Sequence, residues 1–386
     1  MAATINAKEI TTRLQEFFKA LVEPFVGRED EARAIVLAIL AREHAILIGE
    51  PGTAKSALAR RAADLIEARF FKYLLTKYTE PAELFGPLDI NALKEGKYIR
   101  ITSGKLPEAE IVFLDEVFNA NSAILNALLS IMQERVWYDG YSEIVVPLWT
   151  LIGASNRVPD DPELEAVYDR FLIRQYIKPL SENKWPELLD AGWRIEAGLV
   201  KKPKPVLNIA MLKEAHELIY QVDLSPVKQK LLRLYAVFEE RGIHLTDRRK
   251  TKTLKIIAAN ALLEGRLVSA ERDLLALKYT APRDIEDFDR INIILSEELK
   301  MPERYLRELN EIRANVREVS RLVNTLRSYD PRLVDLFRGL KIARSRIITI
   351  MRDVDDQEVQ NLAKQVLEEI DSVLEKITKK LDSLGF

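Results

Sequence analysis

The chain has 386 residues, of which 47% are hydrophobic and 31% are charged. This length predicts more than one domain, and the composition provides for both a core and a charged surface. The absence of cysteine excludes disulfide scaffolds, zinc–thiolate sites, iron–sulfur clusters and thiol nucleophiles. With 58 basic and 60 acidic side chains, the formal net charge is −2, which argues against a dedicated nucleic-acid binder.

Neither a membrane span nor an export signal is expected. No apolar run approaches the roughly 18–20 residues needed to cross a bilayer. Residues 1–14 are polar and mixed, without the pattern of a signal peptide. The three histidines are far apart in sequence, which makes a histidine-rich metal site improbable. We therefore expect a cytoplasmic protein.

Residues 1–180 alternate between helical and strand patterns. Apolar spacing predicts helices over Thr4–Val22, Asp30–Arg42 and Ser56–Arg69. Short apolar runs predict buried strands at Ala45–Ile48, Phe70–Leu75, Ile111–Leu114, Trp149–Ala154 and Arg174–Ile177. The segment Lys97–Ile101 alternates like an exposed hairpin strand. Strands that alternate with helices indicate an α/β domain with a mainly parallel sheet.

Strand signals fade after residue 180. Residues 181–300 are predicted to form a helical domain, with helices over Met211–Tyr220, Val227–Glu240, Arg249–Leu263 and Ser269–Leu277. Residues 301–386 form a third, helical region, with helices over Glu303–Leu326, Arg332–Met351 and Gln357–Leu384. Apolar residues at helical spacing, such as Leu309 and Val316, suit a small bundle packed on the second domain or an arm that docks a partner or tethers subunits.

The segment Gly49–Ser56 follows an apolar strand and opens a helix, as a phosphate-binding loop requires. Backbone N–H groups of such a loop cradle phosphate oxygens. Lys55 would reach the β- and γ-phosphates of ATP, and the Ser56 hydroxyl would ligate Mg²⁺. Ala54 replaces the second glycine of the pattern, which is tolerable if its φ is negative. The alternative is an ordinary strand–turn–helix with a chance lysine. The predicted nucleotide-binding set in this stretch is Gly49, Glu50, Pro51, Gly52, Thr53, Ala54, Lys55, Ser56 and Ala57.

Polar side chains follow two further buried strands. Asp115 and Glu116 end one of them, where ligands bind in open α/β sheets. Asp115 would hold Mg²⁺, and Glu116 would orient and polarise the attacking water as a general base. Asn156 follows the next strand and would hydrogen-bond the γ-phosphate or that water. The alternative roles are helix caps for the acidic pair and a turn residue for Asn156.

Two arginines are candidates for contact with the nucleotide. Arg170, or else Arg174, would arrive from a neighbouring subunit and neutralise charge on the transferred phosphoryl group. Arg248, or else Arg249, stands at a predicted helix start and would reach the nucleotide from the second domain. The alternative for each is an ordinary surface or helix-start arginine.

Together these residues resemble the MoxR family of AAA+ ATPases, and most closely its RavA subgroup. The resemblance covers roughly residues 23–265, and it includes the Ala-Lys pair in the phosphate loop. The matching segments are Gly49–Ser56, Phe85–Leu88, Thr102–Ala109, Asp115–Glu116, Ala154–Asn156, Tyr168–Arg170 and Asp247–Arg249. The tail shows helical period throughout, without the small β domain expected of the RavA subgroup.

The resemblance implies an AAA+ P-loop core, an all-helical lid over residues 181–300 and a hexameric ring that binds ATP and Mg²⁺ between subunits. Val26 and Gly27 would lie near the adenine, and the insert Leu88–Lys105 would face the ring centre. It also implies chaperone-like remodelling or maturation of a protein partner, one with a von Willebrand factor A domain or one that receives a metal or cofactor.

Two other functions fit the same motifs. One is a nucleotide-gated binding module that hydrolyses ATP slowly, with Ala54 as a sign of relaxed catalysis. The other is a DNA-acting AAA+ motor. The presence of Glu116 favours a working ATPase over the first, and the balanced charge disfavours the second.

Overall fold

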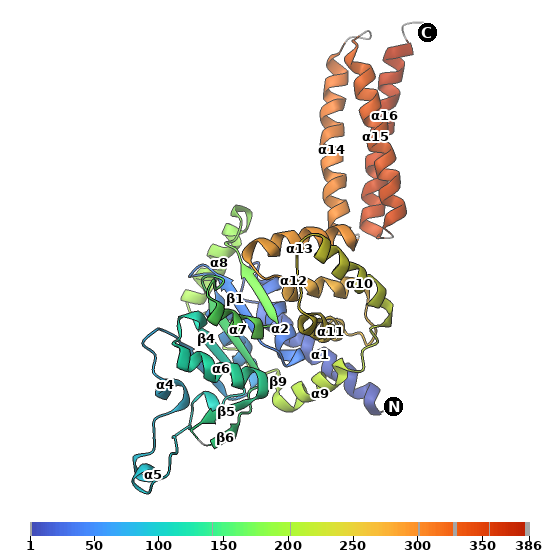
Figure 1. The fold of residues 1–386 in the computed structure, drawn as a ribbon. Helices are drawn as coiled ribbons and strands as arrows, with labels where there is room; N and C mark the ends of the chain where they lie inside the picture. The colour runs from blue at the N-terminus through green and yellow to red at the C-terminus, as the bar shows by residue number, and fades with distance from the viewer. Residues whose placement is uncertain are drawn as a thin grey trace. The chain divides into compact units, whose positions relative to one another are not determined.

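The computed structural model describes residues 2–140, 142–200, 202–299, 302–326, 330–354 and 356–382 (Figure 1). Its internal contacts divide the chain into two compact units, Met1–Ile291 and Asn292–Phe386. Within the described ranges no helix combines the length and the apolar character needed to cross a membrane. The domain boundaries at residues 180 and 300 remain sequence-based predictions.

The first unit is built on a five-stranded sheet in the order β3-β4-β7-β1-β8. The strands are β3 (Phe70–Leu74), β4 (Ile111–Asp115), β7 (Thr150–Ser155), β1 (Ala45–Gly49) and β8 (Ile173–Ile177). Every neighbouring pair is parallel, and β1 and β7 are buried along their whole length. The predicted parallel α/β fold is confirmed, because strands covered on both faces must be apolar throughout.

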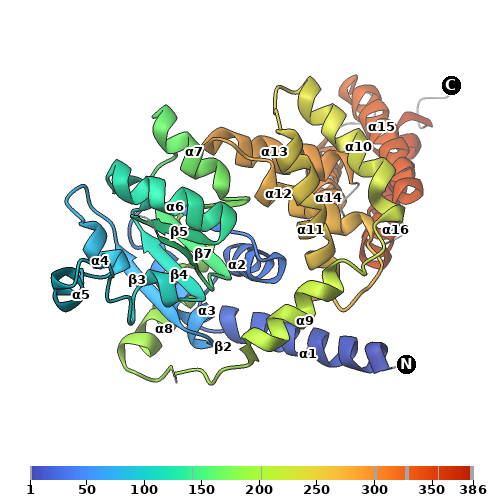
Figure 2. The same cartoon turned by 60° about the horizontal axis from the view of Figure 1, so that its bottom comes forward.

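Helices cover both faces of this sheet (Figure 2). On one face, α6 (Ser122–Glu134) and α7 (Pro162–Arg170) pack against alternate residues of β1 and β4. The other face is covered by α2 (Glu29–Ala41) and α3 (Lys55–Asp64). The helix predicted over 56–69 ends earlier than expected, because the chain turns extended at β2 (Ile66–Glu67) and pairs there with β9 (Leu207–Asn208).

Two extensions project from the sheet. The first is the insert, residues 88–105, which contains α5 (Ile90–Lys94) and reaches away from the core beyond α4 (Pro81–Phe85) (Figure 1). Its predicted strand at 97–101 is wrong in extent, since only a single antiparallel bridge joins Leu88 to Arg100. The second is a hairpin that the sequence did not predict, β5 (Val136–Asp139) with β6 (Ser142–Val145).

The helical part of the first unit follows β8. It consists of α8 (Trp185–Glu196), α9 (Ile209–Ile219), α10 (Ser225–Glu240), α11 (Asp247–Leu263), α12 (Leu277–Thr280) and the start of α13 (Ile285–Glu298). The segment predicted as a helix over 269–277 is instead a 3₁₀ turn, Glu271–Ala276, that leads into α12. The N-terminal helix α1 (Ala2–Val22) packs on α2, α9 and α11.

The second unit contains a bundle of α14 (Pro302–Thr325), α15 (Arg332–Asp353) and α16 (Gln357–Asp382). Along α16 the buried residues recur at alternating steps of four and three, which is the spacing of a coiled-coil seam. They are Val359, Ala363, Val366, Ile370, Val373 and Ile377. The three predicted tail helices are confirmed, although residues 383 and 384 lie outside the described residues. The bundle has a core of its own.

His44 gives the first unit a sensitivity to acid. Its ring is buried, its Nδ1 accepts the Leu151 N–H at 3.0 Å, and its Nε2 lies 3.0 Å from the Met132 carbonyl oxygen. Burial first, and then the charge of Arg135, holds the pKa of His44 well below its usual value. The folded protein therefore keeps this ring neutral at a pH where the unfolded chain takes up a proton.

We expect the free energy of unfolding to fall as the pH drops below about 6.5, with His44 contributing up to about 1.4 kcal/mol per pH unit. Urea unfolding at several pH values measures this slope. His44→Asn should make it shallower between about pH 6.5 and 5. Equal slopes in wild type and His44→Asn would contradict the assignment.

Candidate functional site

The loop between β1 and α3 surrounds the ammonium group of Lys55. This group donates to the carbonyl oxygens of Gly49 at 2.5 Å and Glu50 at 2.9 Å, and to Asn156 Oδ1 at 3.3 Å. Burial lowers the pKa of Lys55, and the charges of Asp115 and Glu116 oppose that shift. The loop thus holds a cation at the N-terminus of α3, where an anionic phosphate is stabilised.

Ala54 has a positive φ of 68°. Alanine was expected here on the condition of a negative φ, and the backbone does not meet that condition. A Cβ in the left-handed region clashes with the following carbonyl and costs about 1–2 kcal/mol. The alanine is therefore accommodated at a position that glycine would occupy without strain.

The acidic pair lies beside the loop, at the end of β4. Ser56 Oγ donates to Asp115 Oδ2 at 2.9 Å, so the two predicted Mg²⁺ ligands already adjoin one another. Hard oxygen donors of this kind fit Mg²⁺, which proteins hold through one or two carboxylates together with substrate phosphates. The pKa of Glu116 is raised by burial and by the neighbouring carboxylate of Asp115. A raised pKa moves a carboxylate toward the range of an effective general base.

Asn156 connects the loop to the acidic pair. Its side-chain oxygen accepts from Lys55, and its amide nitrogen donates to Glu116 Oε1. The strand order explains this meeting, because β4, β7 and β1 are neighbours and all end at the same edge of the sheet. Arg157, which the sequence reading did not select, is close enough to lower the pKa of Glu116.

A hollow of about 490 Å³ adjoins the phosphate loop. Its loop side is formed by Glu50, Pro51, Gly52, Thr53, Ala54 and Ala57. Its other walls are mainly apolar and include Phe25, Val26, Leu180, Trp185, Leu188 and Ile195. Val26 lines this hollow, whereas Gly27 is outside the lining and stands against Leu180. An apolar hollow next to a phosphate loop suits a nucleobase.

The helix α8 forms one wall of this hollow and was missed from the sequence. Trp185, Leu188 and Ile195 recur at helical spacing, and Pro186 occupies the first turn, where proline is favoured. These signals were available in the sequence. The sequence could not show that α8 and the phosphate loop line the same hollow.

The candidate arginines gather around one carboxylate, that of Asp169. Its oxygens lie 3.6 Å from Arg170, 3.8 Å from Arg174, 3.9 Å from Arg248 and 3.6 Å from Arg249. Asp169 and Arg170 end α7, just before β8 begins at Ile173. The cluster thus lies at the amino edge of the sheet, whereas the phosphate loop lies at the carboxyl edge.

Two of these arginines have structural roles. Arg174 is buried, donates to the Pro282 carbonyl oxygen at 2.8 Å and stacks on Tyr168 at 3.9 Å. Arg249 donates to the carbonyl oxygens of Phe171, Leu172 and Thr280 at 2.8–2.9 Å. Burial lowers the pKa of Arg249 to about 9. Both alternatives, Arg174 and Arg249, are therefore committed to joining the sheet domain to the lid.

Arg170 and Arg248 remain more accessible, with 22% and 38% of their side chains exposed. Burial first, and then the charge of Arg248, lowers the pKa of Arg170, which shows that the two guanidinium groups are neighbours. The five residues of β8 separate them from the carboxyl edge by about 13 Å, more than an arginine side chain spans.

A five-stranded parallel sheet with a phosphate loop, an acidic pair and a polar amide at one edge, followed by a helical lid, defines a P-loop nucleotide-binding protein of the AAA+ class. The comparisons agree. A family profile described as the MoxR domain in the MoxR-vWA-beta-propeller ternary systems matches residues 12–218. A profile described as an AAA lid domain matches residues 222–295, so the C-terminal bundle lies beyond both.

Comparison with individual proteins also places the chain near MoxR proteins and ATPases. The chain is 39% identical over 282 residues to the uncharacterized protein MJ0812 of Methanocaldococcus jannaschii, covering 72% of this chain and 74% of that protein. It is 24% identical over 226 residues to the chaperone MoxR1 of Mycobacterium tuberculosis, covering 57% and 52%. A crystal structure from Cytophaga hutchinsonii, assigned as an ATPase, superposes with a TM-score of 0.64 at 17% identity, covering 78% and 97%, and shows the shared fold. The chain belongs to the MoxR family of AAA+ ATPases.

Replacing Ala54 by glycine should stabilise the protein. Relief of the left-handed strain contributes about 1–2 kcal/mol, and the greater freedom of glycine in the unfolded chain offsets about 0.4–1 kcal/mol of it. We expect a net gain near 0.5–1 kcal/mol in urea unfolding, with nucleotide affinity retained. A less stable Ala54→Gly protein would show that this backbone conformation is not the one adopted.

The neighbouring arginines Arg248 and Arg249 should separate into a functional and a structural residue. Arg249→Ala leaves three carbonyl oxygens without their charged donor, so we expect a loss of about 2–4 kcal/mol in the free energy of unfolding. Arg248→Ala removes one long, partly exposed ion pair and should change stability by less than about 0.5 kcal/mol. Urea unfolding of both variants checks this, and the reverse order of stability would refute it.

Proposed function

We propose that this chain hydrolyses ATP with Mg²⁺ at the carboxyl edge of its sheet and uses the energy to remodel or mature a protein partner. One observation carries the proposal: Lys55, Asn156 and Glu116 form a continuous hydrogen-bonded chain beside the Ser56–Asp115 pair. A phosphate grip, a metal-binding pair and a candidate base are thereby within reach of one another.

Each residue of this hydrogen-bonded chain has a distinct role in the proposed reaction. Lys55 would exchange the carbonyl oxygens of Gly49 and Glu50 for phosphate oxygens when ATP enters. Glu116 would accept the proton of the attacking water, and Asn156 would hold that carboxylate in position. Mg²⁺, held by Ser56 and Asp115, would neutralise charge on the phosphate oxygens.

A neighbouring protomer would complete the site. Arg170 and Arg248 lie at the edge of the sheet opposite to the phosphate loop, so neither serves the nucleotide of its own chain. A ring, hexameric by family resemblance, would bring the Asp169 edge of one protomer against the nucleotide of the next. We propose that Arg170, assisted by Arg248, then neutralises the charge of the transferred phosphoryl group.

The proposal for the partner protein is based on the family to which the chain belongs. The matching profile describes MoxR domains in systems with a vWA component, so a protein with a von Willebrand factor A domain is the first candidate. A chaperone-like role agrees with the printed name of the mycobacterial relative. The RavA subgroup remains a sequence-based prediction.

A mixing experiment tests the shared site. Lys55→Ala should abolish ATP binding, Glu116→Gln should bind ATP without turnover, and Arg170→Ala should bind ATP while turnover falls by about 10³-fold or more. If Arg170 acts on the neighbouring nucleotide, mixing inactive Lys55→Ala and Arg170→Ala proteins should restore steady-state hydrolysis, because some interfaces then hold both an intact loop and an intact arginine.

Two control experiments accompany the mixing experiment. Mixing Lys55→Ala with Glu116→Gln should restore nothing, because both residues belong to the loop-bearing side of the interface. Arg352→Ala, on the separate bundle, should hydrolyse ATP at the wild-type rate. Normal turnover by Arg170→Ala alone, or no recovery on mixing, would contradict a role for Arg170 at the nucleotide of the neighbouring protomer.

A further inference from the structure

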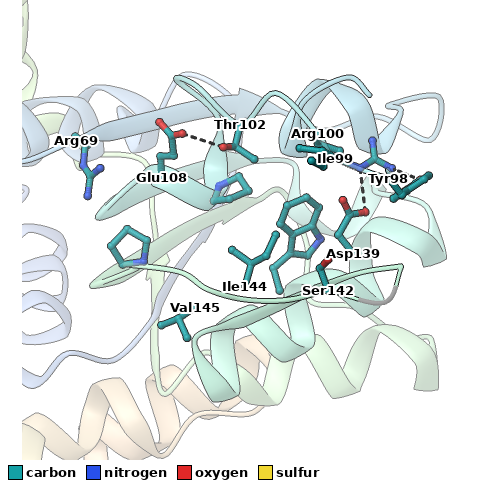
Figure 3. A pocket seen from close by; sticks show the side chains of 13 residues that line it. Arg69, Tyr98, Ile99, Arg100, Thr102, Glu108, Asp139, Ser142, Ile144 and Val145 are labelled. Atoms are coloured by element: carbon teal, nitrogen blue, oxygen red, sulfur yellow. Dashed lines mark hydrogen bonds and ion pairs between the residues drawn. The ribbon is translucent and has the colours of Figure 1, made fainter. Parts of the chain in front are cut away.

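A hollow of about 440 Å³ lies between the insert and the β5–β6 hairpin (Figure 3). We call it the insert–hairpin groove. Tyr98, Ile99 and Thr102 form one wall, and Ile144 and Val145 form the other. Trp137 also lines the hollow. No part of the nucleotide site contributes to its lining.

The groove is held open by a fixed framework. Arg100 donates from the insert to Asp139 of the hairpin at 3.0 Å and to the Gly86 carbonyl oxygen at 2.9 Å. The rings of Phe85 and Trp137 stack with their centroids 5.1 Å apart. Gly86 has a φ of 98°, and a Cβ there would stand 2.0 Å from the Ile101 carbonyl oxygen. Glycine therefore permits the chain that enters the insert to pass close to the chain that leaves it.

Both walls carry backbone groups without a partner among the described residues. The Val146 N–H donates to the Arg135 carbonyl oxygen, so in the β5–β6 register the N–H and C=O of Glu143 and Val145 point away from β5. On the insert, Ile99 and Ile101 bond to residues 87–89, which leaves the N–H and C=O of Arg100 on the opposite edge. Open strand edges of this kind are templates for an added strand.

The charges around the groove argue against a phosphate-rich occupant. Arg100 is paired with Asp139, Glu108 accepts the Thr102 hydroxyl at 2.9 Å, and Arg69 lies 3.7 Å from Glu110. A nucleic-acid backbone needs a row of free cations, which these paired side chains do not supply. The walls are instead apolar and accessible, since Val145 is 78% exposed and Ile99 is 49% exposed.

We infer that the insert–hairpin groove binds an extended, uncharged segment of a partner polypeptide as an added β-strand, with alternate apolar side chains entering the hollow. The inference rests on the proposed remodelling of a protein partner and names its docking site. At about 3.3 Å per residue, β6 provides an edge for roughly four residues of such a segment. Main-chain hydrogen bonds would supply affinity, and the apolar walls would select the side chains.

A labelled peptide tests the inference directly on the full chain. The probe is a fluorescein-labelled peptide with valine at alternate positions between serine and threonine residues, and its binding is followed by fluorescence anisotropy. We expect saturable binding to the wild type and at least tenfold weaker binding to Val145→Asp and to Ile99→Asp, which place a charge in opposite walls. The same peptide, N-methylated at alternate backbone amides, should also bind at least tenfold more weakly.

The matched control is Ile342→Asp, which introduces the same charge at an isoleucine that is 72% exposed on α15 and should bind the peptide like wild type. Thermal unfolding of each variant confirms that it is folded. No binding by wild type, unchanged binding by both groove variants, or equal binding of the N-methylated peptide would overturn the inference. So would capture of labelled oligothymidylate that Val145→Asp abolishes.

ATP hydrolysis without peptide separates this inference from the proposed function. All three aspartate variants should hydrolyse ATP at the wild-type rate, because none lies at the phosphate loop or in the Asp169 cluster. If the wild type hydrolyses ATP but does not bind the peptide, only the inference about the groove is contradicted. If the wild type does not hydrolyse ATP, the proposed function itself is contradicted.

Discussion

The hydrogen-bonded chain from Lys55 through Asn156 to Glu116 is the interaction on which the site depends. It exists because three parallel strands that are distant in sequence end side by side. The two carboxylates lie at the end of β4, Asn156 follows β7, and the loop after β1 leads to Lys55. The carboxylates share that edge with a buried ammonium group, which explains why burial and charge act in opposite directions on Lys55.

The opposite edge of the sheet performs a different task. Around Asp169, the buried guanidinium groups of Arg174 and Arg249 donate to carbonyl oxygens at the start of β8 and in the lid. These bonds join two parts of the fold. A movement of the lid would therefore shift the positions of Arg170 and Arg248, which contact the same carboxylate. In a ring, this arrangement would couple the lid of one protomer to the nucleotide of its neighbour.

The extensions and the bundle lie outside the five-stranded sheet and its covering helices. The insert–hairpin groove owes its shape to a paired Arg100–Asp139 contact and to a glycine crossing, neither of which concerns ATP. The bundle of α14, α15 and α16 has a separate core and lies beyond the matched family profiles. Features outside the core are therefore where partner choice is expected to reside.

The sequence by itself determined the parallel sheet and the three tail helices, and it selected Lys55, Asp115, Glu116 and Asn156, which the structure brings to one edge of that sheet. These depend on local patterns: apolar runs, motif spacing and helical period, all of which act over a few residues. It also indicated the family, since several such motifs recur in order.

Only the tertiary structure decided which arginines are structural, because all four candidates look alike until Asp169 and the lid carbonyls surround them. The positive φ of Ala54, the placement of α8 over the nucleotide hollow and the groove between insert and hairpin were likewise hidden. Each arises from contacts between segments distant in the chain, and the amino acids of one segment do not specify what another segment brings against them.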